Sequence, residues 1–231
     1  MIPTNVIDRT FHIQVADSTG TCFTIDVGNK QYLVTAKHIV KDLSGICGIK
    51  IFHEKRWKNI PITVVGHCKG DIDISVLTAQ LQLSPTHQLE ATSARMSYGQ
   101  DAYFLGFPYG MSSEVGKLNR DFPMPFVKKA IISCMYISED GVQINFLDGH
   151  NNPGFSGGPV VFKELNKSEY KVASVISAFR VTDEPVYQGK QQVPLTYKYN
   201  TGIIISYGVK HAVDLIQSNS IGFELTNRDT E

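Results

Sequence analysis

Short apolar-rich runs bounded by turn residues recur along this chain, and they limit what it can fold into. Phe11–Val15 and Cys22–Val27 alternate apolar and polar residues, as strands with one buried face do. Gly28–Lys30 predicts a turn that leads into a further strand over Gln31–Ala36. Similar runs follow at Pro61–Val65, Ile74–Thr78, Ala102–Phe107, Val127–Ile137, Val142–Phe146, Pro159–Phe162, Lys171–Val181 and Gly202–Ser206. Many short strands with regular turns predict an all-β barrel or sandwich rather than an α/β sheet.

Three segments depart from this pattern. Near the C-terminus, apolar residues recur at helical spacing and predict one helix packed on the β core, through Val209, Ala212, Val213 and Ile216. Gly110–Met124 and Thr182–Asn200 show no clear strand pattern. Loops of that length in a compact domain are functional or mobile.

Charge and length narrow the class of protein. A chain of 231 residues can bury one large all-β domain or two small packed ones. Lysine plus arginine equal aspartate plus glutamate at 22 each, so charge gives no reason to expect nucleic acid or an anionic membrane as partner. No apolar run is long enough to span a bilayer.

The cysteines and the N-terminus bear on compartment and metal. The four cysteines are scattered without a CxxC pair, and Met1–Arg9 shows no basic leader followed by an apolar stretch. We therefore expect a cytoplasmic protein with free thiols. A metal site at His67 and Cys68 with another histidine has no supporting ligand spacing, and we expect no metal or cofactor.

Glycines surround one serine in a way that suits a nucleophile. The segment Pro153–Pro159 reads PGFSGGP and has Ser156 at its centre. Glycine permits backbone angles and close approaches that a side chain would block. The amides of Gly154 and Ser156 could converge as an oxyanion hole, where a substrate carbonyl becomes negative. The alternative is an ordinary glycine-rich turn.

A serine hydroxyl is a weak nucleophile and needs a base, for which histidine is suited. Of seven histidines, His38 follows the apolar run Tyr32–Ala36, so the end of a rigid strand would present the imidazole. A surface histidine at a strand end is the alternative.

A base of this kind needs a carboxylate that fixes its tautomer. Asp73 stands directly before an apolar strand, and Asp71 would face the same side if that strand extended further. We favour Asp73 because the strand starts directly after it. A turn or strand-end aspartate is the alternative.

Three blocks of the sequence, TAKHIV, DISVL and GFSGGPVV, resemble the His, Asp and Ser blocks of the trypsin-like serine peptidases, in the same order. FLGFPYG resembles a segment of the bacterial and organellar high-temperature-requirement branch, although no PDZ-like extension follows here. The resemblance implies an all-β fold of two packed six-stranded antiparallel β-barrels with a C-terminal helix. Residues 1–90 would carry His38 and Asp73, and residues 91–231 would carry Ser156 and the helix.

The resemblance also implies a serine endopeptidase whose polypeptide substrate adds a strand along Ser177, Ala178 and Phe179. His150, Phe179 and Gly202 would form the base of the pocket for the side chain before the scissile bond. No acid stands at the position of trypsin's pocket aspartate, so we expect a small or apolar side chain there.

Departures from the family pattern keep other functions open. Phe155 stands where secreted relatives have an aspartate that pairs with a newly cleaved N-terminus, so we expect no such activation switch. A catalytically inactive or partner-activated peptide-binding module is the main alternative, and a regulatory protein partner would fit it. A serine esterase is disfavoured, because the serine precedes a strand rather than a helix.

Overall fold

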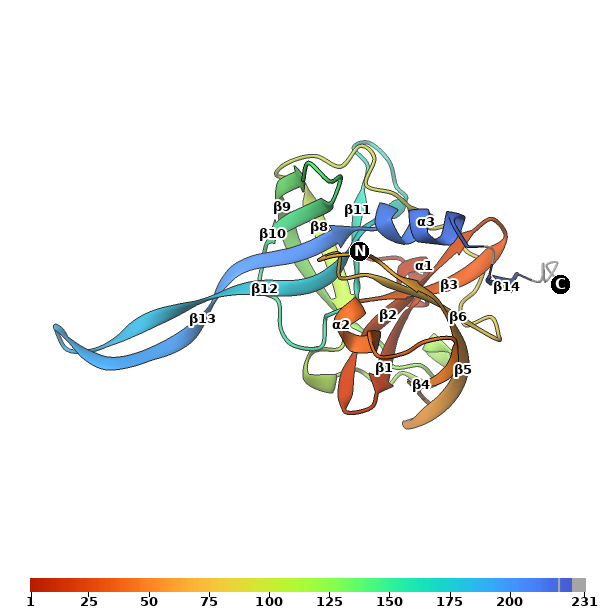
Figure 1. The fold of residues 1–231 in the computed structure, drawn as a ribbon, viewed down its shortest axis with the longest axis horizontal. Coiled ribbons are helices and arrows are strands. Elements are labelled where there is room, and N and C mark those ends of the chain that lie inside the picture. The colour runs from red at the N-terminus through yellow and green to blue at the C-terminus, as the bar shows by residue number, and fades with distance from the viewer. Residues whose placement is uncertain (220, 226–231) are drawn as a thin grey trace.

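The computed structural model describes residues 1–219 and 221–225, and most of them lie in two β-barrels (Figure 1). The last residues of the 91–231 segment therefore lie outside the described part. The first sheet contains β1 (Thr10–Val15), β2 (Ser18–Val27), β3 (Lys30–Thr35), β4 (Ile46–His53), β5 (Arg56–His67), β6 (Ser75–Ala79) and β14 (Phe223–Glu224). Its order is β14-β3-β2-β1-β4-β5-β6, and pairing of β3 with β6 closes six strands into a ring with β14 outside it.

The second sheet repeats this closure. It contains β7 (Glu90–Ala91), β8 (Asp101–Gly106), β9 (Phe126–Ile137), β10 (Gln143–Asp148), β11 (Pro159–Lys163), β12 (Tyr170–Gln188) and β13 (Gln191–Gly208). Its order is β11-β8-β9-β10-β13-β12-β7, and β11 also pairs with β12. Except for the short parallel pair of β7 and β12, neighbouring strands are antiparallel. The two six-stranded barrels implied by the resemblance are thus present.

The helical elements among the described residues are few and short. They are α1 (Thr4–Ile7), α2 (Lys37–Val40), α3 (Lys210–Gln217) and two 3-10 turns, η1 (Pro108–Gly110) and η2 (Gly116–Asn119). The predicted C-terminal helix is confirmed as α3, whose Ala212 and Ile216 are buried. No helix of the described chain is long and apolar enough to cross a membrane.

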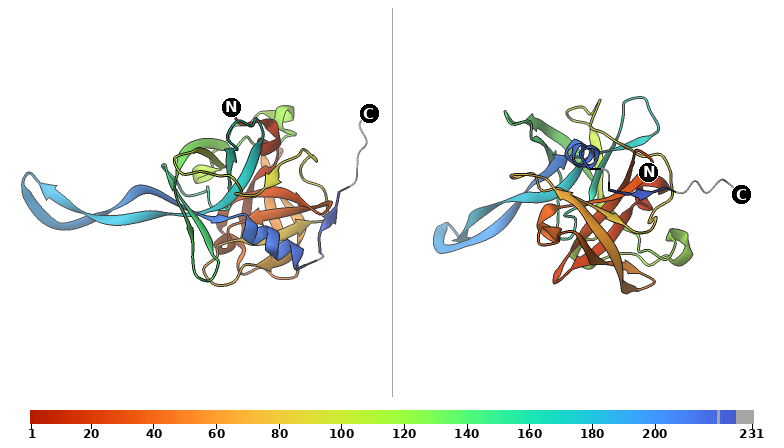
Figure 2. Two further views of the ribbon diagram at one scale, coloured as in Figure 1. Left: turned by 90° about the horizontal axis from the view of Figure 1, so that it is seen from above. Right: turned by 45° about the vertical axis from the view of Figure 1, so that its right-hand side comes forward.

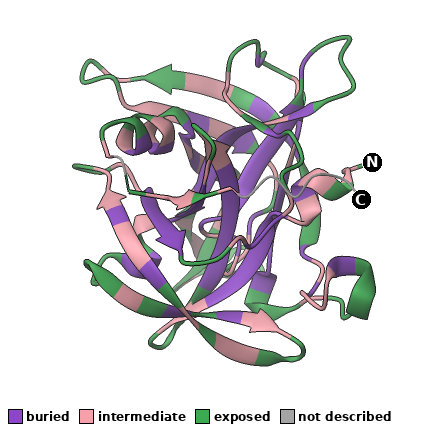
Figure 3. Cartoon of the chain, turned by 90° about the vertical axis from the view of Figure 1, so that its right-hand side faces the viewer, coloured by how far each residue is buried: buried purple, intermediate pink, exposed green. Residues whose placement is uncertain are grey.

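The barrels share part of their core. One buried cluster joins Phe23 and Val34 of the first barrel to Leu105 and Val172 of the second, and Ile216 of α3 also packs there. Figure 3 shows buried residues running along the central strands and exposed residues at the turns. The shared cluster holds the two barrels against each other along the cleft that contains the candidate site.

Each predicted strand is present, several of them longer than predicted, but β4 and the two-residue strands β7 and β14 were missed. β4 was not predicted, because Gly48 interrupts its alternation and only Ile49 and Ile51 are buried. The prediction of no regular strand over Gly110–Met124 is confirmed apart from one isolated bridge, Ser113 to Met124.

The prediction for Thr182–Asn200 was wrong. This segment forms a two-stranded antiparallel ribbon that continues β12 and β13 and extends from the body of the molecule (Figures 1 and 2). Most of its side chains are exposed on both faces, so its sequence lacks the alternation of a half-buried strand. Pro185 and Pro194 suggested a break, yet proline is tolerated in strands that have a free edge.

Candidate active site

Ser156 lies in a tight turn that precedes β11 and fits only glycine at two places. Gly154 has φ +103°, and a Cβ there would lie 2.2 Å from the Phe107 carbonyl oxygen. Gly157 has φ +83°, and its Cβ would lie 2.1 Å from the Thr21 carbonyl oxygen. Both conformations strain any residue with a side chain. The glycines therefore fix the path of the backbone around the serine.

The first barrel holds this turn through Thr21 of β2. Its hydroxyl donates to the Gly154 carbonyl oxygen at 2.8 Å, and its amide donates to the Ser156 carbonyl oxygen at 2.9 Å. Thr35 in turn donates from its hydroxyl to the Thr21 carbonyl oxygen at 2.8 Å. A residue of one barrel thus positions the serine of the other, a role that nothing in the local sequence around Thr21 indicated.

His38 and Asp73 are joined by two hydrogen bonds. His38 is in α2, directly after β3, and Asp73 precedes β6. The backbone N–H of His38 donates to Asp73 Oδ1 at 2.8 Å, and its Nδ1 lies 2.7 Å from Asp73 Oδ2. Pairing of Thr35 with Ser75 brings the two strand ends together. The two hydrogen bonds to Asp73 fix the orientation of the imidazole. They use its Nδ1 and leave its Nε2 out of the contact.

Asp73 is held as a carboxylate. Burial by itself would raise its pKa, but hydrogen bonds from His38 and Ser177 outweigh that effect and lower the pKa below the usual value. The Ser177 hydroxyl donates to Asp73 Oδ2 at 2.6 Å. An ionised Asp73 requires a proton on Nδ1 of a neutral His38, so Nε2 is free to accept one.

The Ser156 hydroxyl donates to the carbonyl oxygen of Ser177 at 3.1 Å. It must turn from this partner to reach the His38 imidazole. The amides of Gly154 and Ser156 donate to no acceptor among the residues that the structure describes. An oxyanion hole requires free N–H donors of this kind beside the nucleophile.

A pocket of about 370 Å³ opens between these groups. Its lining is built from both barrels and consists of His38, Asn151, Asn152, Pro153, Ser156, Ser177, Ala178, Phe179 and Val181. No acidic residue is among the described residues that line it. The pocket thus brings together the expected nucleophile, the expected base and the expected substrate edge.

Two expected pocket residues do not line it. His150 is exposed, and its carbonyl oxygen accepts a hydrogen bond from Lys128. Gly202 accepts from the Gly149 amide and donates to the Asn200 side chain, so both its backbone groups have partners. The base instead falls to Asn151, which is 2% exposed and donates to the Ala178 carbonyl oxygen at 3.4 Å.

Lys128 of β9 supports the segment before the serine turn. Its ammonium donates to Asn152 Oδ1 at 2.7 Å as well as to the His150 carbonyl oxygen. Burial lowers the pKa of Lys128. Its role was not apparent from the sequence, because β9 and this segment are far apart along the chain.

Phe155 places an apolar side chain where the resemblance gives the secreted relatives an aspartate. Its side chain is fully buried, and its ring packs edge-on against Phe104 at 4.9 Å between centroids. The serine turn is therefore fixed by hydrophobic packing inside the second barrel rather than by an ion pair.

The residues weighed as metal ligands are occupied otherwise. Both ring nitrogens of His67 have partners, the Ser75 hydroxyl at 2.7 Å and the Leu43 carbonyl at 2.9 Å. The four cysteines are free thiols, and burial raises the pKa of Cys68 to about 11. A thiol with a raised pKa is a poor metal ligand.

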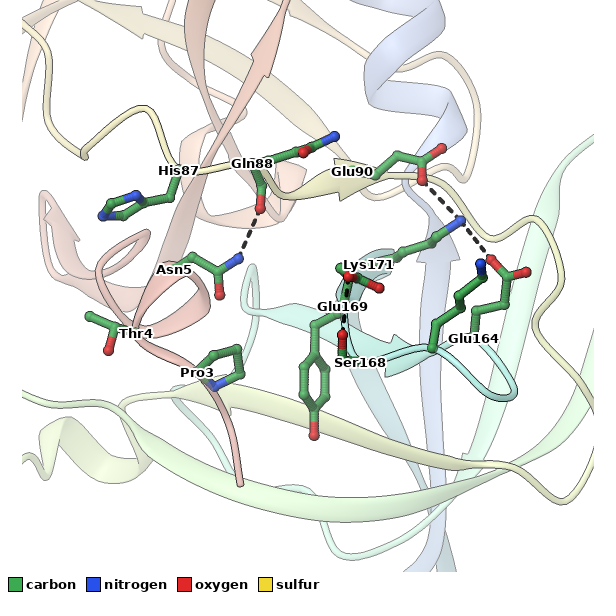
Figure 4. A pocket seen from close by; sticks show the side chains of 12 residues that line it. Pro3, Thr4, Asn5, His87, Gln88, Glu90, Glu164, Ser168, Glu169 and Lys171 are labelled. Carbon is green, nitrogen blue, oxygen red and sulfur yellow. Dashed lines mark hydrogen bonds and ion pairs between the residues drawn. The ribbon is translucent and has the colours of Figure 1, made fainter. Parts of the chain in front are cut away.

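A second hollow, of about 850 Å³, lies beside α1 (Figure 4), and it shares no described lining residue with the pocket at Ser156. Lys171 lies between Glu90 and Glu164 there, at 2.9 and 3.1 Å. Asn5 donates to the Gln88 carbonyl oxygen across the same hollow. Lys171 is thus neutralised by two glutamates, and we assign no chemistry to the hollow.

Comparison with known proteins agrees with this architecture. A family model described as a trypsin-like peptidase domain matches residues 20–166. The chain is similar to the structure of the HtrA-type protease AlgW with tripeptide, with 19% sequence identity and a TM-score of 0.60. That match covers 93% of this chain and 61% of the AlgW chain, so this chain spans about three fifths of its relative's length.

A second similar structure is the Rv3671c protease from M. tuberculosis in its inactive form. It shows 16% sequence identity and a TM-score of 0.58, and the match covers 93% of this chain and 90% of the other. No curated protein sequence matches the chain. At these identities the structural likeness shows the fold, while the family model shows the family.

Proposed function

The chain belongs to the trypsin-like peptidase family, and on that premise we propose that it is a serine endopeptidase that uses Ser156, His38 and Asp73. The observation that carries the proposal is the double hydrogen bond between His38 and Asp73 at the pocket that contains Ser156. The two free amides beside the serine and a pocket shared by both barrels support the same function.

The chemistry follows from the roles of the three side chains, which are those of the chymotrypsin triad. Ser156 Oγ attacks the scissile carbonyl carbon while His38 Nε2 accepts the hydroxyl proton. The carbonyl oxygen becomes negative within reach of the Gly154 and Ser156 amides. Collapse breaks the C–N bond, His38 gives its proton to the leaving amine, and an acyl-enzyme remains. A water molecule then attacks the acyl carbon, with His38 again accepting the proton. The new carboxylic acid is released and the Ser156 hydroxyl is restored.

The pocket bears on which side chain precedes the scissile bond. Apart from His38, its described lining contains no titratable side chain, and its buried member is an amide, Asn151. A lysine or arginine would find no carboxylate to pair with, which would leave its charge poorly compensated. We therefore propose a small or apolar residue at this substrate position. A cytoplasmic location is part of the same proposal, in keeping with four free thiols.

One observation favours a second candidate, a module that is inactive until a partner or substrate binds. The Ser156 hydroxyl is bonded to the Ser177 carbonyl and must be released before it can attack. Catalytic hydrogen bonds often form only in the substrate complex, so this geometry fits a resting enzyme as well.

Labelling with a fluorophosphonate probe tests the proposal, since it requires an activated serine and an oxyanion hole. We expect the wild type to be labelled and Ser156→Ala not to be labelled. Ser44→Ala, which removes an exposed serine elsewhere, is the matched control and should label normally. Absence of labelling in the wild type, also after addition of an unfolded protein substrate, would favour the inactive module.

A further inference from the structure

The ribbon formed by the outer parts of β12 and β13 is the feature that the proposed function leaves unexplained. Its ladder runs from Val181 opposite Asn200 to Gln188 opposite Gln191. Figures 1 and 2 show it extending well beyond the barrels. An isolated two-stranded ribbon is marginally stable in water. A third strand along it would add hydrogen bonds and bury apolar surface.

One edge of β12 is open from the active site outward. β11 pairs with β12 only as far as Val175, and β7 pairs only with Lys171 and Val172. Gly157 and Gly158 bond to Ile176. Beyond that point β12 pairs with β13 alone among the described strands. The opposite edge therefore presents unpaired backbone groups.

The direction of these groups follows from Pro185. The ladder is regular from Val181 to Pro185, whereas its register shifts between Phe179 and Val181. Proline has no N–H and is tolerated in a strand where that position faces a free edge. Successive residues of a strand point their backbone groups to opposite sides. With Pro185 facing the open edge, the N–H and C=O of Val181 and Asp183 face it as well, and the missing N–H of Pro185 ends the row of donors.

The open edge is continuous with the active-site pocket. Phe179 and Val181 line the pocket together with Ser156, and Val181 is also the first residue of the ribbon ladder. A polypeptide held at Ser156 along Ser177–Phe179 would thus meet further unpaired backbone as it left the pocket. The pocket and the edge of β12 that continues it therefore form one surface for the substrate.

The side chains at the far end of this edge carry charge. Asp183 and Glu184 are adjacent, and neither forms an ion pair with any described residue. Lys198 lies opposite Asp183 in the ladder but forms no ion pair with it, and Glu184 lies opposite Tyr197. Two carboxylates without an ion pair beside an open strand edge favour basic side chains on the incoming strand.

We propose that the edge Phe179–Glu184 binds a substrate segment flanking the scissile bond as a third strand of the ribbon, with basic residues opposite Asp183 and Glu184. The inference rests on the proposed endopeptidase function and names its substrate class, an extended polypeptide rather than a short peptide. Strand addition of this kind obtains affinity from main-chain hydrogen bonds and selectivity from the side chains beside them.

Matched substrates of two lengths test the inference. One is a short peptide around a scissile bond, and the others extend it by eight residues, on the N-terminal or the C-terminal side, with or without lysines. The ribbon is removed by replacing residues 182–199 with Asn-Gly, since Val181 and Asn200 are opposite each other and suit a two-residue turn. The readout is the ratio of kcat/KM for long and short substrates.

We expect one extended substrate to be preferred by about tenfold or more in the wild type, as a few added hydrogen bonds would give. The ratio should fall to about one without the ribbon. Asp183→Asn with Glu184→Gln should remove only the preference for lysine. Glu139→Gln with Asp140→Asn, an exposed adjacent acidic pair in another turn, is the matched control. Equal cleavage of long and short substrates by the wild type would overturn the inference.

Binding separates this inference from the proposed chemistry. The Ser156→Ala protein should bind the labelled long peptide, and removal of the ribbon should weaken binding to the level of the short peptide. That result would uphold strand addition even if no peptide were cleaved. Sedimentation of the same proteins tests whether a second copy of this chain, rather than the substrate, occupies the open edge. Self-association that depends on the ribbon and is not displaced by the long peptide would overturn the proposal.

Discussion

At the scale of single residues, Asp73 and His12 illustrate two ways in which burial acts on a titratable group. Asp73 remains ionised because three donors surround its carboxylate, the His38 backbone and ring and the Ser177 hydroxyl. His12 is almost fully buried, stacked on Phe107 and edge-on to Trp57, and no partner is found for its Nε2 within the described structure. Burial lowers the pKa of His12 to about 4.

Replacing Asp73 by asparagine should lower turnover by up to about four decades while the fold is kept, because the amide favours the wrong imidazole tautomer. Steady-state kinetics on a labelled unfolded protein, with thermal unfolding as a check on folding, measures this. Asp71→Asn, two residues earlier and exposed, is the control and should act like the wild type. An unchanged rate in Asp73→Asn would remove Asp73 from the proposed triad.

His12 should make stability depend on pH. Its pKa is about 4 in the folded protein and 6.5 in the unfolded chain, so the unfolded chain binds the proton first as the pH falls. The stabilisation is fully present above pH 6.5 and is lost between about 6.5 and 4, by about 3 kcal/mol in total.

Urea unfolding between pH 4 and 7 checks this expectation. His12→Phe, which keeps an aromatic ring between Trp57 and Phe107, should flatten the dependence over that window. His87→Gln, at an exposed histidine, should leave the dependence as it is. A wild-type stability that is constant from pH 6.5 to pH 4 would contradict the assignment to His12.

At the scale of elements, the serine turn and the β12–β13 ribbon are built in opposite ways. The turn is confined, with two positive-φ glycines pressed against Phe107 and Thr21. The ribbon is open, with paired backbone on one side and most side chains in solvent. The first arrangement suits the positioning of reacting atoms, and the second suits the capture of a flexible partner.

Gly154→Ala should disrupt the turn more than its positive φ alone would. The new methyl would meet the Phe107 carbonyl oxygen, so the turn must shift and the Gly154 amide with it. We expect fluorophosphonate labelling to slow by about 100-fold or more, the usual cost of one oxyanion donor. Gly141 has φ +78° and no atom within 4 Å of an added methyl group, so Gly141→Ala measures the effect of backbone strain without a steric clash. Equal labelling rates in the two variants would show that the Gly154 amide is not needed.

At the scale of the whole molecule, the two barrels depend on each other. A shared cluster buries side chains from both barrels and from α3, and Thr21 of the first barrel bonds to the serine turn of the second. β14, which follows α3, adds to the first sheet beside β3. The pocket exists only where the barrels meet, so its geometry follows from their packing.

The shared core predicts a single unfolding transition. Leu105→Ala, in the second barrel, should destabilise the protein by about 2–5 kcal/mol, because it leaves a cavity in this cluster. The single tryptophan, Trp57, lies in the first barrel and should report the same lowered midpoint as far-UV circular dichroism. Leu165→Ala, at an exposed leucine, should change little. A Trp57 transition that stays at the wild-type midpoint would mean that the barrels unfold independently.

Local patterns determined much of this protein. Alternation of apolar residues predicted most strands, helical spacing predicted α3, and the glycines around Ser156 predicted a tight turn. These features follow from contacts within a few residues, which the sequence states directly. The sequence also placed His38 and Asp73 at the ends of strands, where rigid backbone could hold them.

Only the tertiary structure decided which distant residues complete the site. Thr21, Lys128 and Asn151 act through partners that are remote in sequence, so no local pattern could identify them. His150 and Gly202, which were expected at the base of the pocket, are not among its described lining residues. The ribbon was missed because a strand exposed on both faces needs no apolar alternation. Burial patterns record what a residue packs against, whereas pairing across barrels depends on how whole sheets close and meet.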